Sequence, residues 1–207
     1  MTARQLPTLD QRTLRDAFSA FPSGVVAVAA SVKGHLVGIA ASSFTSVSIE
    51  PPLVSFSVAT SSSSWPLLRE AGHLGVSVLP DHHDDFCRQL AGPREQRFDG
   101  LPFTVTEAGA VLLQEAVATF DVTLHDEIEA GDHVIVLLRI HRVGTGDGQR
   151  PLVFHKSGFA KLDRADLDPT PLEGRVNGAE VQQAGPADDL ADGDREIEAE
   201  KGEDDAA

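Results

Sequence analysis

The alternation of apolar and polar positions predicts many short strands and few helices, and the first predicted element is one of those helices. Asp10 has a side chain suited to cap a helix N-terminus. Leu14, Ala17 and Phe18 follow it at the spacing of one apolar helix face. The Pro-Ser-Gly sequence at 22–24 ends this pattern, so the sequence predicts a short amphipathic helix ahead of the first strand.

The next apolar segments predict a β-hairpin and a strand inside a sheet. Residues 25–32 and 35–41 are rich in Val, Ala and Ile, and Lys33 and Gly34 between them are turn residues. Residues 53–58 are too densely apolar for a half-exposed strand and suit a strand covered on both faces. We therefore expect this last strand to be central in its sheet.

The rest of the chain gives more strands than helices. Short helices are expected over 65–71 and 83–90, and strands over 73–79, 103–106, 116–127, 133–143 and 151–154. Short strands at regular spacing, separated by turns and brief helices, favour a barrel over a βαβ sheet. The sequence therefore predicts a mainly β fold with short helices.

Charge divides the chain into a body and a tail. The net charge is -15, but residues 163–207 hold fifteen acids and four bases and so contribute eleven of those charges. This segment has no Phe or Trp and few large aliphatic residues, so it cannot bury enough apolar surface to fold. We expect an N-terminal extension over 1–12, one domain over 13–165 and a disordered acidic tail over 166–207. The tail is either a docking or solubilising segment or a solvated extension with no partner.

Cysteine content and hydropathy indicate a cytoplasmic protein. Cys87 is the single cysteine, so no intramolecular disulfide can form, and we expect it to be a small buried apolar residue. The first thirty residues lack the basic and apolar regions of a secretory leader. The longest apolar stretch, residues 25–32, is too short to span a bilayer, so no membrane segment is expected.

Common hydrolytic, metal and nucleotide motifs are missing from the sequence. It contains no GxSxG, HExxH, P-loop or GxGxxG pattern, so nicotinamide binding by a Rossmann fold is not expected. His82 and His83 precede Asp84 and Asp85, but adjacent histidines on a helix point in different directions. We therefore expect a solvated helix start at this segment and no metal site.

Three segments carry a more specific signal: FPSGV at 21–25, AASSFTSVS at 40–48 and SSSSWPLL at 61–68. EPPLV at 50–54 lies between the second and third segments, and GDH at 131–133 lies downstream. In this order and spacing the series resembles the flavin reductase-like family of split-barrel FMN-binding proteins, from about Leu14 to Leu162. The resemblance implies an FMN-binding split β-barrel.

The resemblance also implies a flavin site, and its residue types suit a flat ring carrying an anionic phosphate. Small side chains let a backbone approach the ring, and hydroxyl and amide groups near a helix start can bind phosphate. Relatives often carry Arg or Lys where this chain has Thr60, and Arg94 or Arg97 could supply that charge instead. By resemblance, the ring and ribityl chain lie along Ser23, Ala41, Ser42, Ser43 and Phe44, the phosphate lies near Ser61, Ser62, Ser64 and Trp65, and Arg97, His155 and Phe159 are further contacts.

His133 is the candidate catalytic residue, because the resemblance places the histidine of GDH beside the nicotinamide. The implied reaction is reduction of FMN or FAD by NADH or NADPH, in which the protein mainly stacks and orients two rings. The resemblance further implies a homodimer and release of reduced flavin to a partner monooxygenase, with no nucleic acid or membrane partner. Two alternatives stay open: a flavin carrier with little turnover, and a split-barrel reductase with another acceptor.

Overall fold

The computed structural model of the chain describes residues 9–146 and 148–162, so the predicted acidic tail lies outside the described residues. The elements in chain order are α1 (Gln11–Ser19), β1 (Ser23–Gly24), β2 (Val26–Val32), β3 (His35–Ala41), β4 (Thr45–Ser48), β5 (Leu53–Ala59), α2 (Trp65–Leu68), β6 (Leu74–Val78), α3 (Asp84–Leu90), the 3-10 helix η1 (Arg94–Gln96), β7 (Phe103–Val105), β8 (Val111–Leu113), β9 (Ala118–Ala130), β10 (His133–Thr145), β11 (Leu152–His155) and β12 (Gly158–Lys161). The fold is mainly β with short helices, as the sequence predicts.

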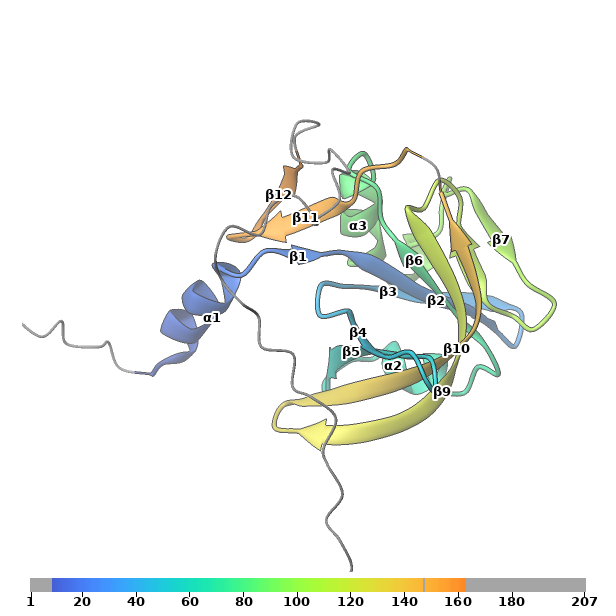
Figure 1. The fold of residues 1–207 in the computed structure, drawn as a ribbon, viewed down its shortest axis with the longest axis horizontal. Coiled ribbons are helices and arrows are strands. Elements are labelled where there is room, and N and C mark those ends of the chain that lie inside the picture. Colours follow the sequence, from blue (N-terminus) through green and yellow to red (C-terminus); the bar gives the residue numbers. More distant parts are fainter. Residues whose placement is uncertain (1–8, 147, 163–207) are drawn as a thin grey trace, which may run out of the picture. The chain divides into compact units, whose positions relative to one another are not determined.

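A seven-stranded antiparallel sheet forms most of the described chain, in the order β3-β2-β6-β9-β10-β5-β4. The predicted hairpin is its first pair, and Lys33 and Gly34 turn the chain with φ values of 52° and 83°. A smaller sheet, β1-β11-β12, lies beside α3 in Figure 1, while the β9–β10 hairpin curves along the opposite side of the body. The pair β7-β8 completes the strands of the described residues.

Strand β2 is buried on both faces and separates two apolar clusters, because successive side chains of a strand point to opposite faces. Val26 and Val28 belong to one cluster, which we call the barrel core, and Ala27 belongs to the other, which we call the α3 core. The barrel core consists of Val26, Val28, Ala30, Val37, Val54, Phe56, Val58, Trp65, Leu68, Leu74, Val76, Val122, Val136 and Leu138, and the α3 core of Val25, Ala27, Leu79, Cys87, Leu90, Leu101, Leu113 and Leu152.

Two predictions about these elements need correction. Strand β5 is largely buried, as predicted, but β4 and β10 flank it, so it lies one strand from the sheet edge and not at the centre. The edge strand β4 is mostly exposed and reads as polar, which is why the apolar pattern did not reveal it. Helix α2 forms one turn only, shorter than the 65–71 expected, because Glu70 and Ala71 make tighter i to i−3 bonds to Leu67 and Leu68 in place of further α-helical bonds.

Cys87 lies in the α3 core and is a free thiol, which confirms the expectation of a buried apolar role. Burial raises its pKa, so the thiolate is disfavoured. None of the helices within residues 9–146 and 148–162 has the length and apolar character needed to cross a membrane.

Helix α1 confirms the first sequence prediction but leaves its apolar face uncovered. The Asp10 carboxylate accepts a hydrogen bond from the Thr13 amide at 2.7 Å, which caps the helix. No residue of α1 is buried, although its apolar residues share a face. Phe18 is 70% exposed and Phe21, just after the helix, is 78% exposed. An apolar face of this kind usually packs against another surface.

Truncation after Asp168 should leave the fold and its activity unchanged. The residues that the structure describes all lie in one compact unit, and the segment after Asp168 is acidic and has no aromatic residue. The chain ending at Asp168 should match the full chain in thermal midpoint and in NADH oxidation with added FMN. A lower thermal midpoint or a lower rate per active site would assign the tail a part in the folded domain.

Candidate functional site

A hollow of about 380 Å³ at the C-terminal end of β3, which we call the β3 pocket, brings five predicted residues together. They come from three segments far apart in sequence: the end of β3, the serine run and the start of β10. The five are Ala41, Ser42, Ser43, Ser62 and His133, and the remaining lining residues are Ile39, Ala40, Ser57, Val58 and Ala59. Every one of these side chains except His133 is small or aliphatic.

The loop that leaves β3 is held by a side-chain hydrogen-bond pair. The Ser43 hydroxyl donates to the Ser57 carbonyl oxygen at 3.0 Å and accepts from the Ser57 amide at 2.9 Å. It thus replaces the backbone ladder just before β4 begins to pair with β5. Because the Ser43 hydroxyl is used in these two bonds, Ser43 can contact a ligand through its backbone. The exposed Ser42 side chain faces the hollow.

Thr60 explains how the serine run and the GDH turn meet. Its amide and its hydroxyl both donate to the Asp132 carbonyl oxygen, at 3.0 and 3.1 Å. These bonds join the end of β5 to the turn between β9 and β10, and His133 is paired with Ala59 in the sheet. Thr60, where relatives often carry Arg or Lys, therefore joins the segment before the serine run to the turn before His133.

His133 is oriented by its neighbour in the sequence. Its Nδ1 lies 2.7 Å from Oδ1 of Asp132, and this hydrogen bond lowers the pKa of the Asp132 carboxyl. A carboxylate at Nδ1 favours the tautomer that carries the proton there, which leaves Nε2 as the acceptor. The His133 side chain is 46% exposed and lines the pocket, so its ring is open to a ligand.

Two arginines reach the serine run. Arg94 Nη2 donates to the Ser63 carbonyl oxygen at 2.9 Å, and Arg97 Nη1 donates to the Ser64 hydroxyl at 2.8 Å. Ser62 accepts from the Trp65 amide at 3.2 Å and so caps the single turn of α2. Positive charge beside the serine run therefore comes from η1 and the residue after it.

Arg97 acts mainly as a clamp between chain segments. Besides Ser64, its Nε donates to the Gly92 carbonyl oxygen at 2.9 Å and its Nη1 to the Gly38 carbonyl oxygen at 2.7 Å. Partial burial lowers the pKa of its guanidinium, which remains charged. Neither arginine lines the β3 pocket, and the side chain of Arg94 is the more exposed of the two.

A second hollow of about 270 Å³ adjoins the first and shares Ala40, Ala41 and Ser42 with it. Phe159 was predicted for the site and lines this hollow, with its ring 5.0 Å from the Arg88 guanidinium carbon. The sequence analysis did not assign the other side chains of this hollow to the site, because each alone is an ordinary strand or helix position. These are Val25, Cys87, Arg88, Ala91 and Phe154.

The remaining predicted site residues do not line either hollow. Ser64 and Trp65 are buried, and the Trp65 indole donates to Glu127 Oε1 at 2.6 Å, so their polar atoms are already used within the protein. Phe44 packs against Phe120 with ring centroids 5.8 Å apart. Ser23 pairs with Phe154 between β1 and β11, Ser61 is exposed at the start of the serine run, and His155 ends β11 opposite Gly158.

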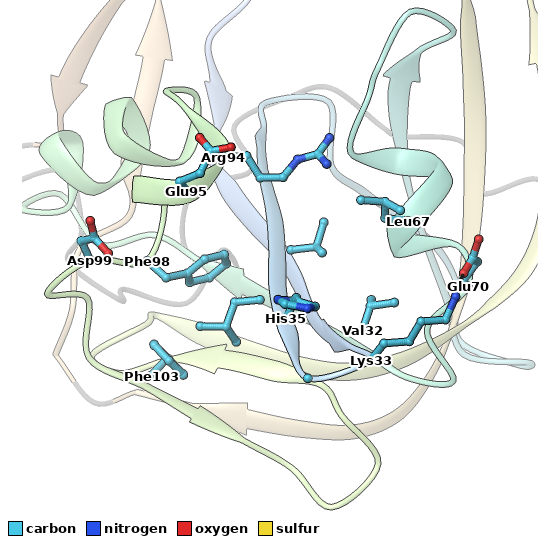
Figure 2. A pocket seen from close by; sticks show the side chains of 13 residues that line it. Val32, Lys33, His35, Leu67, Glu70, Arg94, Glu95, Phe98, Asp99 and Phe103 are labelled. Atoms are coloured by element: carbon cyan, nitrogen blue, oxygen red, sulfur yellow. Dashed lines mark hydrogen bonds and ion pairs between the residues drawn. The ribbon is translucent and has the colours of Figure 1, made fainter.

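A third hollow, about 670 Å³, lies farther back along β3 and contains none of the predicted site residues. Figure 2 shows Phe98 and Phe103 on one side of it and Leu67 on the other, with Lys33 reaching Glu70. That ion pair has an N–O distance of 3.0 Å between two exposed side chains. Arg94 also lines this hollow, so it lies between the serine run and the apolar wall of Phe98.

Known proteins resemble this chain in sequence and in fold. The family model described as "Flavin reductase like domain" matches residues 18–163. A flavin reductase of Pseudomonas putida is 36% identical over 152 residues, covering 73% of this chain and 89% of the relative. Component B of a nitrilotriacetate monooxygenase from Mycobacterium thermoresistibile has a TM-score of 0.75 at 26% identity, covering 85% of this chain and 96% of that one. An NADH:FAD oxidoreductase of Streptomyces globisporus, solved with NAD and FAD fragments, has a TM-score of 0.73 at 29% identity, covering 78% and 98%.

Proposed function

Because this chain belongs to the flavin reductase-like family, we propose that it is an NAD(P)H:flavin oxidoreductase that reduces FMN or FAD at the β3 pocket. The observation that carries this proposal is the meeting of residues 41–43, Ser62 and His133 in one hollow, although they are far apart in sequence. A module that only stored flavin would not need the paired histidine at its edge.

The lining of the pocket fits a flavin. Ala41 and Ser42 leave their backbone open to a flat ring, and Ser43 holds that backbone in place through Ser57. Val58 and Ala59 add an apolar wall. A ring with polar edges needs both features, since apolar contact supplies affinity and a few placed polar groups fix orientation.

The phosphate of the flavin nucleotide fits beside the serine run. Ser62 lines the pocket, and Arg94 bonds to the backbone of Ser63 while its side chain stays exposed. A guanidinium can bind phosphate with two parallel hydrogen bonds. Arg94 therefore takes the place of the cation that Thr60 does not supply.

His133 lies at the edge of the pocket, where a nicotinamide would approach a bound flavin. When both cofactors are bound, the nicotinamide supplies a hydride and the flavin accepts it, so the chemistry belongs to the cofactors. The Asp132 carboxylate holds the imidazole, whose Nε2 can accept a hydrogen bond from a carboxamide. The protein's share of catalysis is to orient the donor and to keep water from the space between the rings.

Steady-state kinetics separates this function from its alternatives. NADH and NADPH oxidation should require added FMN, FAD or riboflavin and should saturate with flavin concentration. Tight flavin binding without NAD(P)H consumption would instead identify a carrier. If NAD(P)H reduces a bound flavin rapidly but steady-state turnover needs a different electron acceptor, the chain would be a split-barrel reductase with another acceptor.

We also propose that reduced flavin leaves this chain for a partner monooxygenase in the cytoplasm. The structural relative from Mycobacterium thermoresistibile is named as a monooxygenase component, and residues 18–163 already account for most of the described chain. The pocket is an open hollow at the surface, which suits exchange of flavin. The single buried thiol is compatible with a reducing compartment.

A homodimer completes the proposal, and the uncovered face of α1 is the surface we assign to it. Phe18 and Phe21 are both more than two-thirds exposed. The Lys156 amide donates to the Ser19 carbonyl oxygen at 2.8 Å, which ties the end of α1 to the β11–β12 turn. A second copy covering α1 would therefore also approach the hollow that contains Phe154 and Phe159.

The Phe18→Asp/Phe21→Asp variant should be a folded monomer with weaker flavin binding. Two buried charges at a contact surface are not tolerated, whereas the helix itself contributes no buried residue to the described fold. Analytical ultracentrifugation and an FMN titration measure the two effects. Val105→Asp, which charges an exposed apolar residue on β7, is the matched control and should stay dimeric. A variant that sediments like the wild type would remove α1 from the interface.

A further inference from the structure

The segment between β6 and α3 brings two histidines next to a carboxylate. Helix α3 begins at Asp84, so His82 and His83 lie in the turn before it, and their ring centroids are 4.5 Å apart. The two residues therefore precede the helix, and their side chains do not point apart as the sequence predicted. Glu115, from the turn between β8 and β9, faces both rings.

The three ligand atoms have the spacing of a metal site. Nε2 of His82 lies 3.0 Å from Oε2 of Glu115, and Nε2 of His83 lies 3.9 Å from the same oxygen. All three groups lie within 4.8 Å of one another. Ligands about 2.0–2.1 Å from a tetrahedral Zn²⁺ are about 3.4 Å from each other, so a small side-chain movement would enclose an ion.

His83 supplies the independent evidence for a ligand. Its side chain is 2% exposed, and its Nδ1 has no hydrogen-bond partner among the residues that the structure describes. Its Nε2 is turned toward Glu115 but is too far from Oε2 for a hydrogen bond. A cation at Nε2 would give this buried ring a bond on that nitrogen, and Nδ1 would then carry the ring proton.

A carboxylate lies behind one of the two rings. The buried Asp81 has its Oδ1 3.7 Å from Nδ1 of His82 and pairs with Arg150 through its other oxygen at 2.7 Å. A carboxylate behind a ligating histidine is the usual outer partner of such a ligand.

We propose that His82, His83 and Glu115 bind a divalent transition-metal cation, with Zn²⁺ as the best match, and that an exposed fourth position is filled by water. Two imidazoles and one carboxylate suit zinc and disfavour Mg²⁺ and Ca²⁺, which prefer oxygen ligands. The ion joins the turn before α3 to the turn after β8. It thereby holds the start of the helix that carries Cys87 and Arg88 into the second hollow.

The test uses the full chain freed of metal by a chelator and titrated with Zn²⁺ against a chromophoric competitor. His82→Ala and Glu115→Gln are the informative variants, because their side chains are 44% and 61% exposed and their loss should not unfold the chain. His133→Ala is the matched control, since His133 is 46% exposed and also pairs with a carboxylate. Its zinc affinity should equal that of the wild type.

The wild type should bind one Zn²⁺ per chain, and each of the two variants should lose at least about 100-fold in affinity, the upper end of the cost of losing an outer-shell partner. Zinc should raise the thermal midpoint of the wild type and not that of Glu115→Gln. Co²⁺ should give the intense visible bands of a tetrahedral site, and Mg²⁺ should not compete. The proposal is overturned if both variants bind Zn²⁺ within about tenfold of the wild type, or if His133→Ala loses as much affinity as they do.

Discussion

Replacement of Ser42 by leucine should weaken FMN binding about 5- to 150-fold. Ser42 lines both hollows, so a larger side chain there intrudes on the surface that the flavin ring must approach. Forcing extra carbon atoms into a fitted space costs about 1–3 kcal/mol, and each 1.4 kcal/mol changes a dissociation constant tenfold. The residue is exposed and outside the strands, so the cost should fall on binding and not on folding.

An FMN titration followed by flavin fluorescence measures this effect, and the thermal midpoint checks the fold. Ser42→Ala is the matched control, because it removes the hydroxyl without adding bulk and should bind FMN nearly as well as the wild type. Ser43→Leu should also bind more weakly, and it loses two hydrogen bonds to Ser57 as well. Wild-type affinity in both leucine variants would remove residues 41–43 from the site.

Local patterns were sufficient to predict most of the fold. The cap at Asp10, the turn at Lys33 and Gly34 and the apolar density of 53–58 each produced the element they indicate. The predicted mainly β split-barrel fold is confirmed, since the NADH:FAD oxidoreductase of Streptomyces globisporus shares it. Strand order was not predictable in the same way, because pairing depends on contacts between distant segments. Strand β4 was missed because it has no apolar face.

The candidate site was predictable only as separate segments. The small residues at 41–43 and the histidine at 133 follow from the family resemblance, but their meeting depends on Thr60 bonding to Asp132, 72 residues away. Ser64 and Trp65 matched the motif equally well and are instead buried. A motif identifies residue types that suit a ligand, whereas packing decides which of them face it.

Arg88 and Phe154 show what sequence reasoning missed. Arg88 forms a hydrogen bond with Asp84 at 2.8 Å, an ordinary helix-surface pair at i, i+4, and only the fold carries it over the Phe159 ring. Glu115 is similar, since nothing in the sequence near it suggests that it faces His82 and His83. Residues that act across long sequence separations leave no local signal.

His133→Ala should slow reduction of bound flavin about 5- to 150-fold while leaving flavin affinity near the wild-type value. The His133 imidazole lies at the edge of the β3 pocket. The groups assigned to the flavin ring and to its phosphate are on other segments. Loss of one orienting contact costs about 1–3 kcal/mol at the transition state, which corresponds to this range of rates. Binding and chemistry should therefore separate in this variant.

Stopped-flow reduction by NADH, with the nicotinamide concentration varied, separates nicotinamide binding from hydride transfer. Asp132→Asn keeps the imidazole but removes the carboxylate that fixes its tautomer, so it should slow transfer less than His133→Ala does. His125→Ala, on an exposed position of β9, is the control and should reduce flavin at the wild-type rate. If His133→Ala also transfers hydride at the wild-type rate and binds NADH normally, the histidine only shapes the turn, and orientation of the nicotinamide must come from other residues around the pocket.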